Sequence, residues 1–271
     1  MRRVSLSRRR LLLRAAGAAA GWSALAPALG RVRNGGRGAM AASTNEALTI
    51  RWLGHSAFLI KRGPLRLVTD PFADNMGYPP IRAEADVVTV SHEHFDHNNV
   101  QAVQGRPRVF RALKDGTWRS IDEQVGGELA IRAFPSYHDD RQGQARGKNG
   151  IFLLEWAGVR IVHLGDLGHR LGAAPGTVTA EQLKPVHLLL IPVGGYYTID
   201  AAVAREVVSA LQPSVVVPMH YRTRAIAGWP LAPVDDFIAH YPSVRRIAGE
   251  RAWSAPPAGQ PEVWLFAEPA T

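Results

Sequence analysis

The sequence predicts a layered α/β (α+β) domain, and two features of its pattern support this class. Short apolar segments typical of buried strands recur between residues 48 and 266, whereas segments with helical periodicity are few. Several of the apolar segments end in a histidine or an aspartate. We therefore expect sheets packed against helices, with polar side chains gathered where the strands give way to loops.

The N-terminal region differs from the rest of the chain. Residues 1–28 carry the twin arginines Arg8–Arg9, a following Leu/Ala/Gly stretch and a small-residue motif at 26–28, which is typical of a twin-arginine export signal. Arg14 interrupts the stretch, which is shorter than the roughly 18–20 apolar residues of a membrane span. We predict a cleaved signal peptide and a periplasmic or secreted protein without stable membrane insertion. If translation starts at Met40 instead, the protein is cytoplasmic.

Most of the positive charge belongs to this region and to the segment behind it. Residues 1–28 hold six arginines and no acid, and segment 29–45 holds three more arginines, which together account for the formal charge of +9. The remaining residues are balanced, so a nucleic-acid partner is not expected, and a small-molecule substrate is. The Gly/Arg/Ala-rich segment 29–45 is predicted to be a flexible linker, followed by one domain over 46–271. The pattern does not indicate an oligomeric state.

The chain contains no cysteine. Disulfides and a cysteine-linked lipid anchor are therefore excluded. Any metal ion would have to be bound by histidine, aspartate or glutamate.

The domain is expected to begin near Leu48 with a series of strands. Residues 48–54 and 57–70 match successive short strands, with Arg62-Gly63-Pro64 forming a turn inside the second segment. Further strands are predicted at 85–90, 131–136, 151–156, 159–166, 187–194, 214–220 and 263–266. Segments 57–70 and 151–166 share the order strand, glycine turn, strand and aspartate, which is compatible with a sandwich of two similar halves.

Fewer segments have the pattern of helices. Apolar residues recur every four positions from Ile199 to Leu211, which predicts an amphipathic helix with Thr198 as a possible N-cap. Shorter helices are predicted at 98–103, 179–184 and 233–241.

A dense polar cluster, SHEHFDHNN, follows the apolar run that ends at Val90. It contains His92, His94, Asp96 and His97 within six positions. Because alternate residues of an extended segment point the same way, the first two histidines can bind one metal, and the other two residues can turn toward a second. The alternative is a polar loop whose histidines cap neighbouring elements.

Three more candidate ligands each follow an apolar segment: His138, Asp166 and His220. With them the candidates number seven, which is too many for one metal. They fit two metals about 3.5–4 Å apart, bridged by a carboxylate and a water. Histidine and carboxylate ligands favour zinc, with manganese or iron as alternatives.

The ligand order resembles that of the metallo-β-lactamase superfamily, which has the signature His-x-His-x-Asp-His followed by His, Asp and His. Other motifs are similar to one branch of that superfamily: GHSAFLI (54–60), DPF (70–72), HLGDLGH (163–169), IPVGGYYTID (191–200) and PMHY (218–221). That branch contains uncharacterised metal-dependent hydrolases related to L-ascorbate-6-phosphate lactonase and, more distantly, to N-acyl-phosphatidylethanolamine phospholipase D. The resemblance covers residues 48–225 and implies a four-layer αββα sandwich with the metals at one edge of its paired sheets.

The resemblance also implies a role for each ligand. The first metal would be bound by His92, His94 and His138. The second would be bound by Asp96, His97 and His220, and Asp166 would bridge the two. Asp70 would orient a ligand histidine rather than bind metal, although it could instead start a turn before Pro71. Because Asp166 is present and cysteine is absent, true β-lactamase activity is not expected.

These residues together predict a dinuclear metal-dependent hydrolase in which a metal-bridging hydroxide attacks a carbonyl or phosphoryl centre. Asp96 is predicted to relay a proton from the attacking water. The expected substrate is a lactone or related cyclic ester. The alternatives are a phosphodiesterase similar to phospholipase D and a non-catalytic metal-binding or sensor protein. A phosphate group would require a cation near the site, and the candidates are Arg141, Arg146, Lys148, Arg222 and Arg224.

Four further residues are candidates for substrate contact: His55, His169, Tyr196 and Tyr221. Tyr197 is a similar candidate beside Tyr196. The alternative for these tyrosines is ordinary packing at an element boundary.

Overall fold

The structure is a computed structural model that describes residues 46–257 and 259–270. The predicted signal peptide (1–28) and the predicted linker (29–45) both lie outside these residues. Among the helices of the described part, none is both long and apolar enough to cross a membrane.

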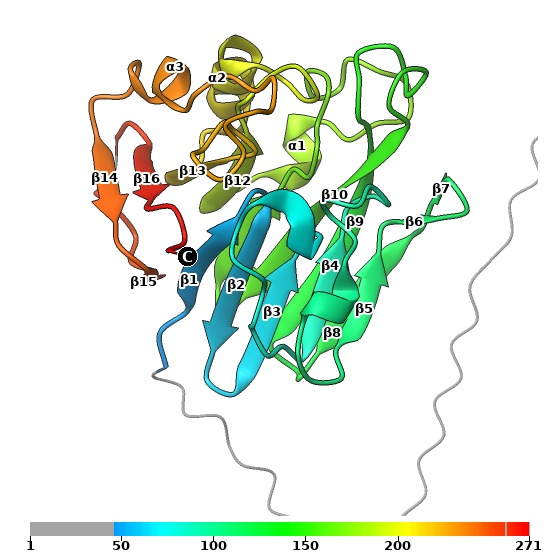
Figure 1. The fold of residues 1–271 in the computed structure, drawn as a ribbon, viewed down its shortest axis with the longest axis vertical. Helices are drawn as coiled ribbons and strands as arrows, with labels where there is room; N and C mark the ends of the chain where they lie inside the picture. The colour runs from blue at the N-terminus through cyan, green and yellow to red at the C-terminus, as the bar shows by residue number, and fades with distance from the viewer. Residues whose placement is uncertain (1–45, 258, 271) are drawn as a thin grey trace, which may run out of the picture. The chain divides into compact units, whose positions relative to one another are not determined.

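One sheet has six strands in the order β15-β1-β2-β3-β4-β5 (Figure 1). Their bounds are β1 Thr49–Gly54, β2 Ala57–Arg62, β3 Leu65–Thr69, β4 Val87–Val90, β5 Arg108–Arg111 and β15 Glu250–Ala252. Strands β1, β2 and β3 form an antiparallel meander, and β3, β4 and β5 run parallel. The strands predicted at 48–54, 57–70 and 85–90 are confirmed.

The other sheet has eight strands in the order β14-β16-β13-β12-β11-β10-β9-β8. Their bounds are β8 Ile121–Val125, β9 Leu129–Tyr137, β10 Lys148–Trp156, β11 Val159–His163, β12 Leu188–Pro192, β13 Val215–Met219, β14 Val244–Ile247 and β16 Glu262–Phe266. A two-stranded ribbon pairs β6 Leu113–Lys114 with β7 Thr117–Trp118. All the strands predicted for this half of the chain are confirmed.

The strands that the sequence did not predict are mostly edge strands. Strands β5, β8, β14 and β15 each lie at the end of a sheet. Strand β8 buries only its first and last residues, and β14 buries only its last. An edge strand buries few side chains and therefore lacks the apolar run on which the prediction depended.

The helices are α1 Ala180–Leu183, α2 Ala201–Leu211 and α3 Asp235–Ile238, with 3-10 turns η1 Asp74–Met76 and η2 Val100–Ala102. The prediction of Thr198 as the cap of the long helix is wrong. Asp200 caps α2, and its side chain accepts a hydrogen bond from Val203 N at 2.8 Å. The helix predicted at 98–103 is also wrong in type, because that segment forms only the short turn η2.

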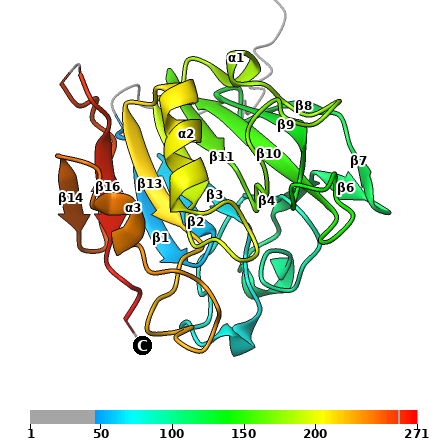
Figure 2. The ribbon, with the colours of Figure 1, turned by 90° about the horizontal axis from the view of Figure 1, so that it is seen from above.

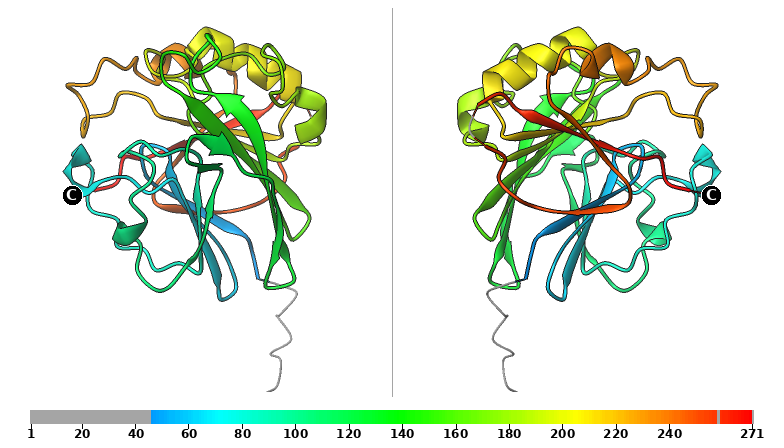
Figure 3. Two further views of the ribbon diagram at one scale, coloured as in Figure 1. Left: turned by 90° about the vertical axis from the view of Figure 1, so that its right-hand side faces the viewer. Right: turned by 90° about the vertical axis from the view of Figure 1, so that its left-hand side faces the viewer.

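The two sheets pack face to face, as the alternation along β2 shows. Phe58 and Ile60 belong to the main core between the sheets, whereas Ala57 and Leu59 belong to a smaller core on the outer face of the six-stranded sheet. Figures 2 and 3 show α1, α2 and α3 outside the eight-stranded sheet. Turns η1 and η2 and their loops lie on the other side (Figure 3). The αββα sandwich is confirmed, with 3-10 turns and loops in the outer layer over the smaller sheet.

Candidate metal centre

All seven predicted ligands lie at the carboxyl ends of strands. Strand β4 leads into the cluster 92–97, and β9, β11 and β13 lead into His138, Asp166 and His220. Strands β11, β12 and β13 run parallel, and β9 has the same direction because it is separated from β11 by one antiparallel strand. Strands β9, β11 and β13 therefore deliver their ligands to one edge of the eight-stranded sheet. The cluster that follows β4 lies at the same edge, since His97 Nε2 is 3.2 Å from Asp166 Oδ2.

Three groups of side chains have donor atoms within 4.8 Å of one another, and two of them contain all the predicted ligands except Asp166. One group is His92, His94 and His138, the other is His55, Asp96, His97 and His220, and the third consists of Asp70, His92 and His97. The first two groups match the division that the superfamily resemblance implies, with His55 added to the second. Six of the seven residues in these two groups are buried, and His94 is exposed.

Asp166 lies between the two groups. Its Oδ2 atom is 3.1 Å from His138 Nε2, 3.2 Å from both His97 Nε2 and His220 Nε2, and 3.8 Å from His92 Nε2. A carboxylate in this position can reach a metal in either group. This is the geometry that a bridging ligand needs.

Several polar atoms of this centre are buried without a hydrogen-bond partner among the described residues. They are His92 Nε2, His97 Nε2, both ring nitrogens of His220, and Asp166 Oδ1. Leaving such an atom unpaired costs about 1–3 kcal/mol. Lone pairs that converge from histidine and aspartate are what a zinc-type ion binds, so the residues fit divalent metal ions.

Asp70 orients two of the histidines. Its Oδ2 atom is 3.0 Å from His97 Nδ1 and also accepts a short hydrogen bond from the hydroxyl of Ser91, whose amide donates to Oδ1 at 2.8 Å. Because Ser91 Oγ gives its hydrogen to Asp70, it accepts from His92 Nδ1 at 2.9 Å. These hydrogen bonds fix the rings of His92 and His97 so that their Nε2 atoms face the centre, 3.8 and 3.2 Å respectively from Asp166 Oδ2.

Replacing Asp70 with alanine is expected to weaken metal binding about 10- to 100-fold, because partners of this kind fix the tautomer and orientation of ligand histidines. Competition between the protein and a chromogenic zinc chelator measures this affinity. Asp74→Ala, at an exposed carboxylate in η1, is the matched control. Equal zinc affinity in Asp70→Ala and wild type would refute the orienting role.

His55 lies on the side of the ligands that faces away from the metal cavity, and it does not line that cavity. It is fully buried, its Nε2 atom is 3.1 Å from Asp96 Oδ2, and its ring centroid is 4.1 Å from that of His220. Burial and the neighbouring His220 lower the pKa of His55 to about 4, so the ring is neutral at pH 7. Burial alone would raise the pKa of Asp96, but His97 and the hydrogen bond to His55 hold it well below its usual range. His55 thus holds Asp96 ionised and in place.

Asn149 fixes the loop that carries Asp166. Its Oδ1 atom accepts from Asp166 N at 3.0 Å, and its Nδ2 atom donates to Leu164 O at 2.9 Å. A Cβ on Gly165 would lie 2.3 Å from Asn149 Oδ1, so only glycine fits between these two bonds. Sequence reasoning missed Asn149 and Ser91, because neither residue type is distinctive at a strand end.

A cavity of about 410 Å³ opens onto the centre. It is lined by His94, Phe95, Asp96, His138, Ala145, Arg146, Asp166, Tyr197, His220 and Trp229. The centroid of the Trp229 ring is 6.2 Å from that of Phe95 and 6.0 Å from that of Tyr197, so the three rings form an aromatic wall. Trp229 belongs to a loop with no recognisable motif, so it could not be predicted as a lining residue.

The four residues predicted to contact substrate do not line this cavity. His169 uses both ring nitrogens on backbone groups, Tyr137 N and Arg170 O. Tyr221 is buried and stacked on Trp52 at 5.6 Å. Neither residue lines the cavity, and nor do His55 and Tyr196.

Of the predicted cations, only Arg146 lines this cavity. Lys148 lies over the ring of Trp118 at 4.6 Å. Arg222 and Arg224 line a separate cavity beside β16. Arg141 is exposed and lines neither cavity.

The sequence and the fold are similar to those of known metal-dependent hydrolases. Residues 49–220 match a family model described as a β-lactamase superfamily domain. UPF0173 metal-dependent hydrolases from Archaeoglobus fulgidus and Hyperthermus butylicus are each 30% identical to this chain, over 65% and 64% of it and 84% and 83% of their own lengths. The likeness to the lactonase and the phospholipase D that the motifs suggested stays a prediction.

Solved structures agree. A Thermotoga maritima protein assigned as a zinc-dependent hydrolase of the metallo-β-lactamase superfamily superposes with a TM-score of 0.64 and 34% identity, covering 81% of this chain and 98% of its own. A protein from Parabacteroides distasonis has a TM-score of 0.55 with 18% identity, covering 80% and 92%, which supports the fold alone.

Proposed function

Because this chain belongs to the metallo-β-lactamase superfamily, among its UPF0173 metal-dependent hydrolases, we propose that it hydrolyses a lactone or a related cyclic ester. The reaction would take place at a centre of two divalent metal ions, and zinc is the first candidate. The observation that carries the proposal is the position of Asp166. Its Oδ2 atom lies within 3.2 Å of ligand nitrogens from both groups of the centre.

When bound, the metal ions would supply an activated water and an electrophile for the substrate oxygen. Asp166 holds the two ligand groups together. Asp96 lines the cavity, its Oδ2 atom is held by His55, and its carboxylate would accept the proton of the attacking water. No serine or cysteine nucleophile is required.

The lining of the cavity supports an ester with an apolar body. Apart from the candidate ligands, it consists of Ala145, the aromatic wall and Arg146. Such a lining suits an uncharged scissile group flanked by apolar atoms. A phosphodiester is the second candidate, and Arg146 is the observation that favours it, since a guanidinium can pair with a phosphate.

Metal analysis of the purified protein followed by a substrate screen tests the proposal. We expect about two equivalents of zinc, manganese or iron per chain, and faster turnover of lactones than of bis-p-nitrophenyl phosphate by the same sample. Faster turnover of the phosphodiester would favour the second candidate. A fully metal-loaded protein that is inert toward esters, lactones and phosphodiesters would leave the non-catalytic alternative.

A further inference from the structure

Resting on the proposed hydrolase function, we propose that the substrate carries a carboxylate or phosphate group outside the scissile bond. Arg146 binds this group where the metal cavity meets a second cavity. The rest of the substrate, an apolar or aromatic body, lies against the aromatic wall of Phe95, Tyr197 and Trp229. The substrate class is therefore an amphiphilic anionic ester.

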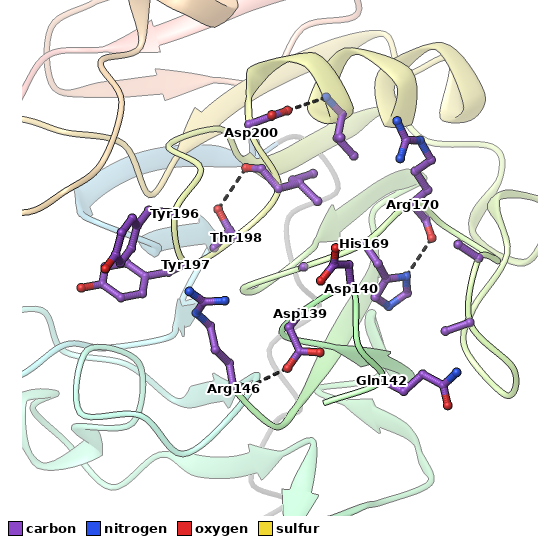
Figure 4. Close-up of a pocket in the computed structure, with 15 residues that line it drawn as sticks. Asp139, Asp140, Gln142, Arg146, His169, Arg170, Tyr196, Tyr197, Thr198 and Asp200 are labelled. Carbon is purple, nitrogen blue, oxygen red and sulfur yellow. Dashed lines mark hydrogen bonds between the residues drawn. The ribbon is translucent and has the colours of Figure 1, made fainter. Parts of the chain in front are cut away.

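The second cavity is continuous in its lining with the first. It has a volume of about 420 Å³ and shares Arg146 and Tyr197 with the metal cavity. Figure 4 shows Arg146 reaching from its loop toward Tyr197 and the segment that leads to Asp200. A ligand that extends from the metal cavity into the second cavity passes beside these two shared side chains.

Arg146 is available to bind an anion. Among the described residues no carboxylate lies within 4.0 Å of its guanidinium, which instead packs against the rings of Tyr196 and Tyr197, 5.9 and 5.7 Å from their centroids. Arg170, which also lines the second cavity, differs because it is paired with Glu206. A guanidinium positioned on aromatic rings keeps its N–H edge free for bidentate bonds to a carboxylate or phosphate.

The loop that carries Arg146 is fixed to the metal centre. Asp139, the neighbour of ligand His138, is buried, and its carboxylate accepts hydrogen bonds from four backbone amides of this loop. The donors are the amides of Arg141, Gly143, Ala145 and Arg146, at 2.7–3.0 Å. The backbone of Arg146 is thus tied to that of His138 before any substrate arrives, which lowers the entropic cost of binding.

The acidic residues of the second cavity do not compete for this role. Asp139 is used by the loop amides, and Asp200 caps α2 through Val203 N. Asp140 is the remaining carboxylate of the described lining, and it lies beyond ion-pair distance of Arg146.

Calorimetric binding to the zinc-loaded protein tests the proposal with three related probes. Hippurate carries an aromatic ring and a carboxylate, benzoyl-ethanolamine phosphate replaces the carboxylate with a phosphate, and hippuramide is the neutral counterpart. We expect Arg146→Gln to weaken binding of at least one anionic probe about 10- to 100-fold, with hippuramide changed less than about twofold. The anionic probe that loses more affinity identifies the group. Arg146→Lys should restore part of the loss, because it keeps the charge without the planar fork.

Arg141→Gln is the matched control, since this exposed arginine is on the same loop and lines neither cavity. It should bind all three probes as wild type does. The proposal is overturned if Arg146→Gln leaves both anionic probes unchanged, if it weakens hippuramide equally, or if wild type binds neither anion. Because binding is measured without turnover, a protein inert as a hydrolase would be recognised separately from one in which Arg146 binds no anion.

Discussion

Replacing Asp166 with alanine is expected to remove metal and activity together. Its carboxylate is the group that lies within 3.2 Å of ligand nitrogens in both halves of the centre. Without it, His97 and His220 on one side and His138 on the other lose their shared partner. We expect metal content to fall from about two ions per chain to one or fewer, and turnover to fall by roughly 10²–10³-fold or more.

Elemental analysis of the purified variant, together with turnover of the best lactone or ester substrate, measures both effects. Asp166→Asn separates charge from shape, since the amide keeps the size of the side chain but is a much poorer bridge between cations. Asp122→Ala, at an exposed carboxylate of β8, is the control and should match wild type. An Asp166→Ala protein that keeps two ions and near-normal turnover would rule out the bridging role.

The ligands could be predicted from sequence because their signal is local. His92, His94, Asp96 and His97 lie within six positions, and His138, Asp166 and His220 each stop an apolar run. A strand that ends in a metal-binding residue is recognisable in the sequence as an apolar run followed closely by histidine or aspartate. The layered α/β class was predictable for a related reason, because the central strands are buried on both faces and consist of continuous apolar runs. The αββα sandwich was implied by the resemblance to the metallo-β-lactamase superfamily.

The groups that surround the ligands could not be predicted in the same way. Ser91 relays between Asp70 and His92, Asn149 fixes the Asp166 loop, and Trp229 closes the aromatic wall. Each acts through a contact distant in the sequence, such as that between Asn149 and Asp166. Tyr221 lies beside a ligand in the sequence, but its ring packs on Trp52 and it does not line the metal cavity, which fits the alternative of ordinary packing.

Two glycines, Gly194 and Gly168, allow close backbone packing against the segments that carry His220 and His138, respectively. A Cβ on Gly194 would lie 2.2 Å from His220 O and 3.0 Å from Tyr221 Cα. A Cβ on Gly168 would lie 2.2 Å from both His138 C and Asp139 N. All of these are backbone atoms, which cannot swing aside as the end of a flexible side chain can, so the ligand segment itself must move.

Gly194→Ala is therefore expected to lower the free energy of unfolding by about 1–3 kcal/mol, the usual cost of overpacking a core. It is also expected to lower the affinity for the metal ion bound by His220 and its group. Gly168→Ala is expected to do the same to the group of His138. Urea denaturation of the metal-free proteins measures the first effect, and stepwise zinc competition measures the second. Gly228→Ala is the matched control, because a Cβ there meets nothing within 4 Å. If Gly194→Ala loses stability but binds both ions as wild type does, the backbone of His220 does not set the geometry of its half of the centre.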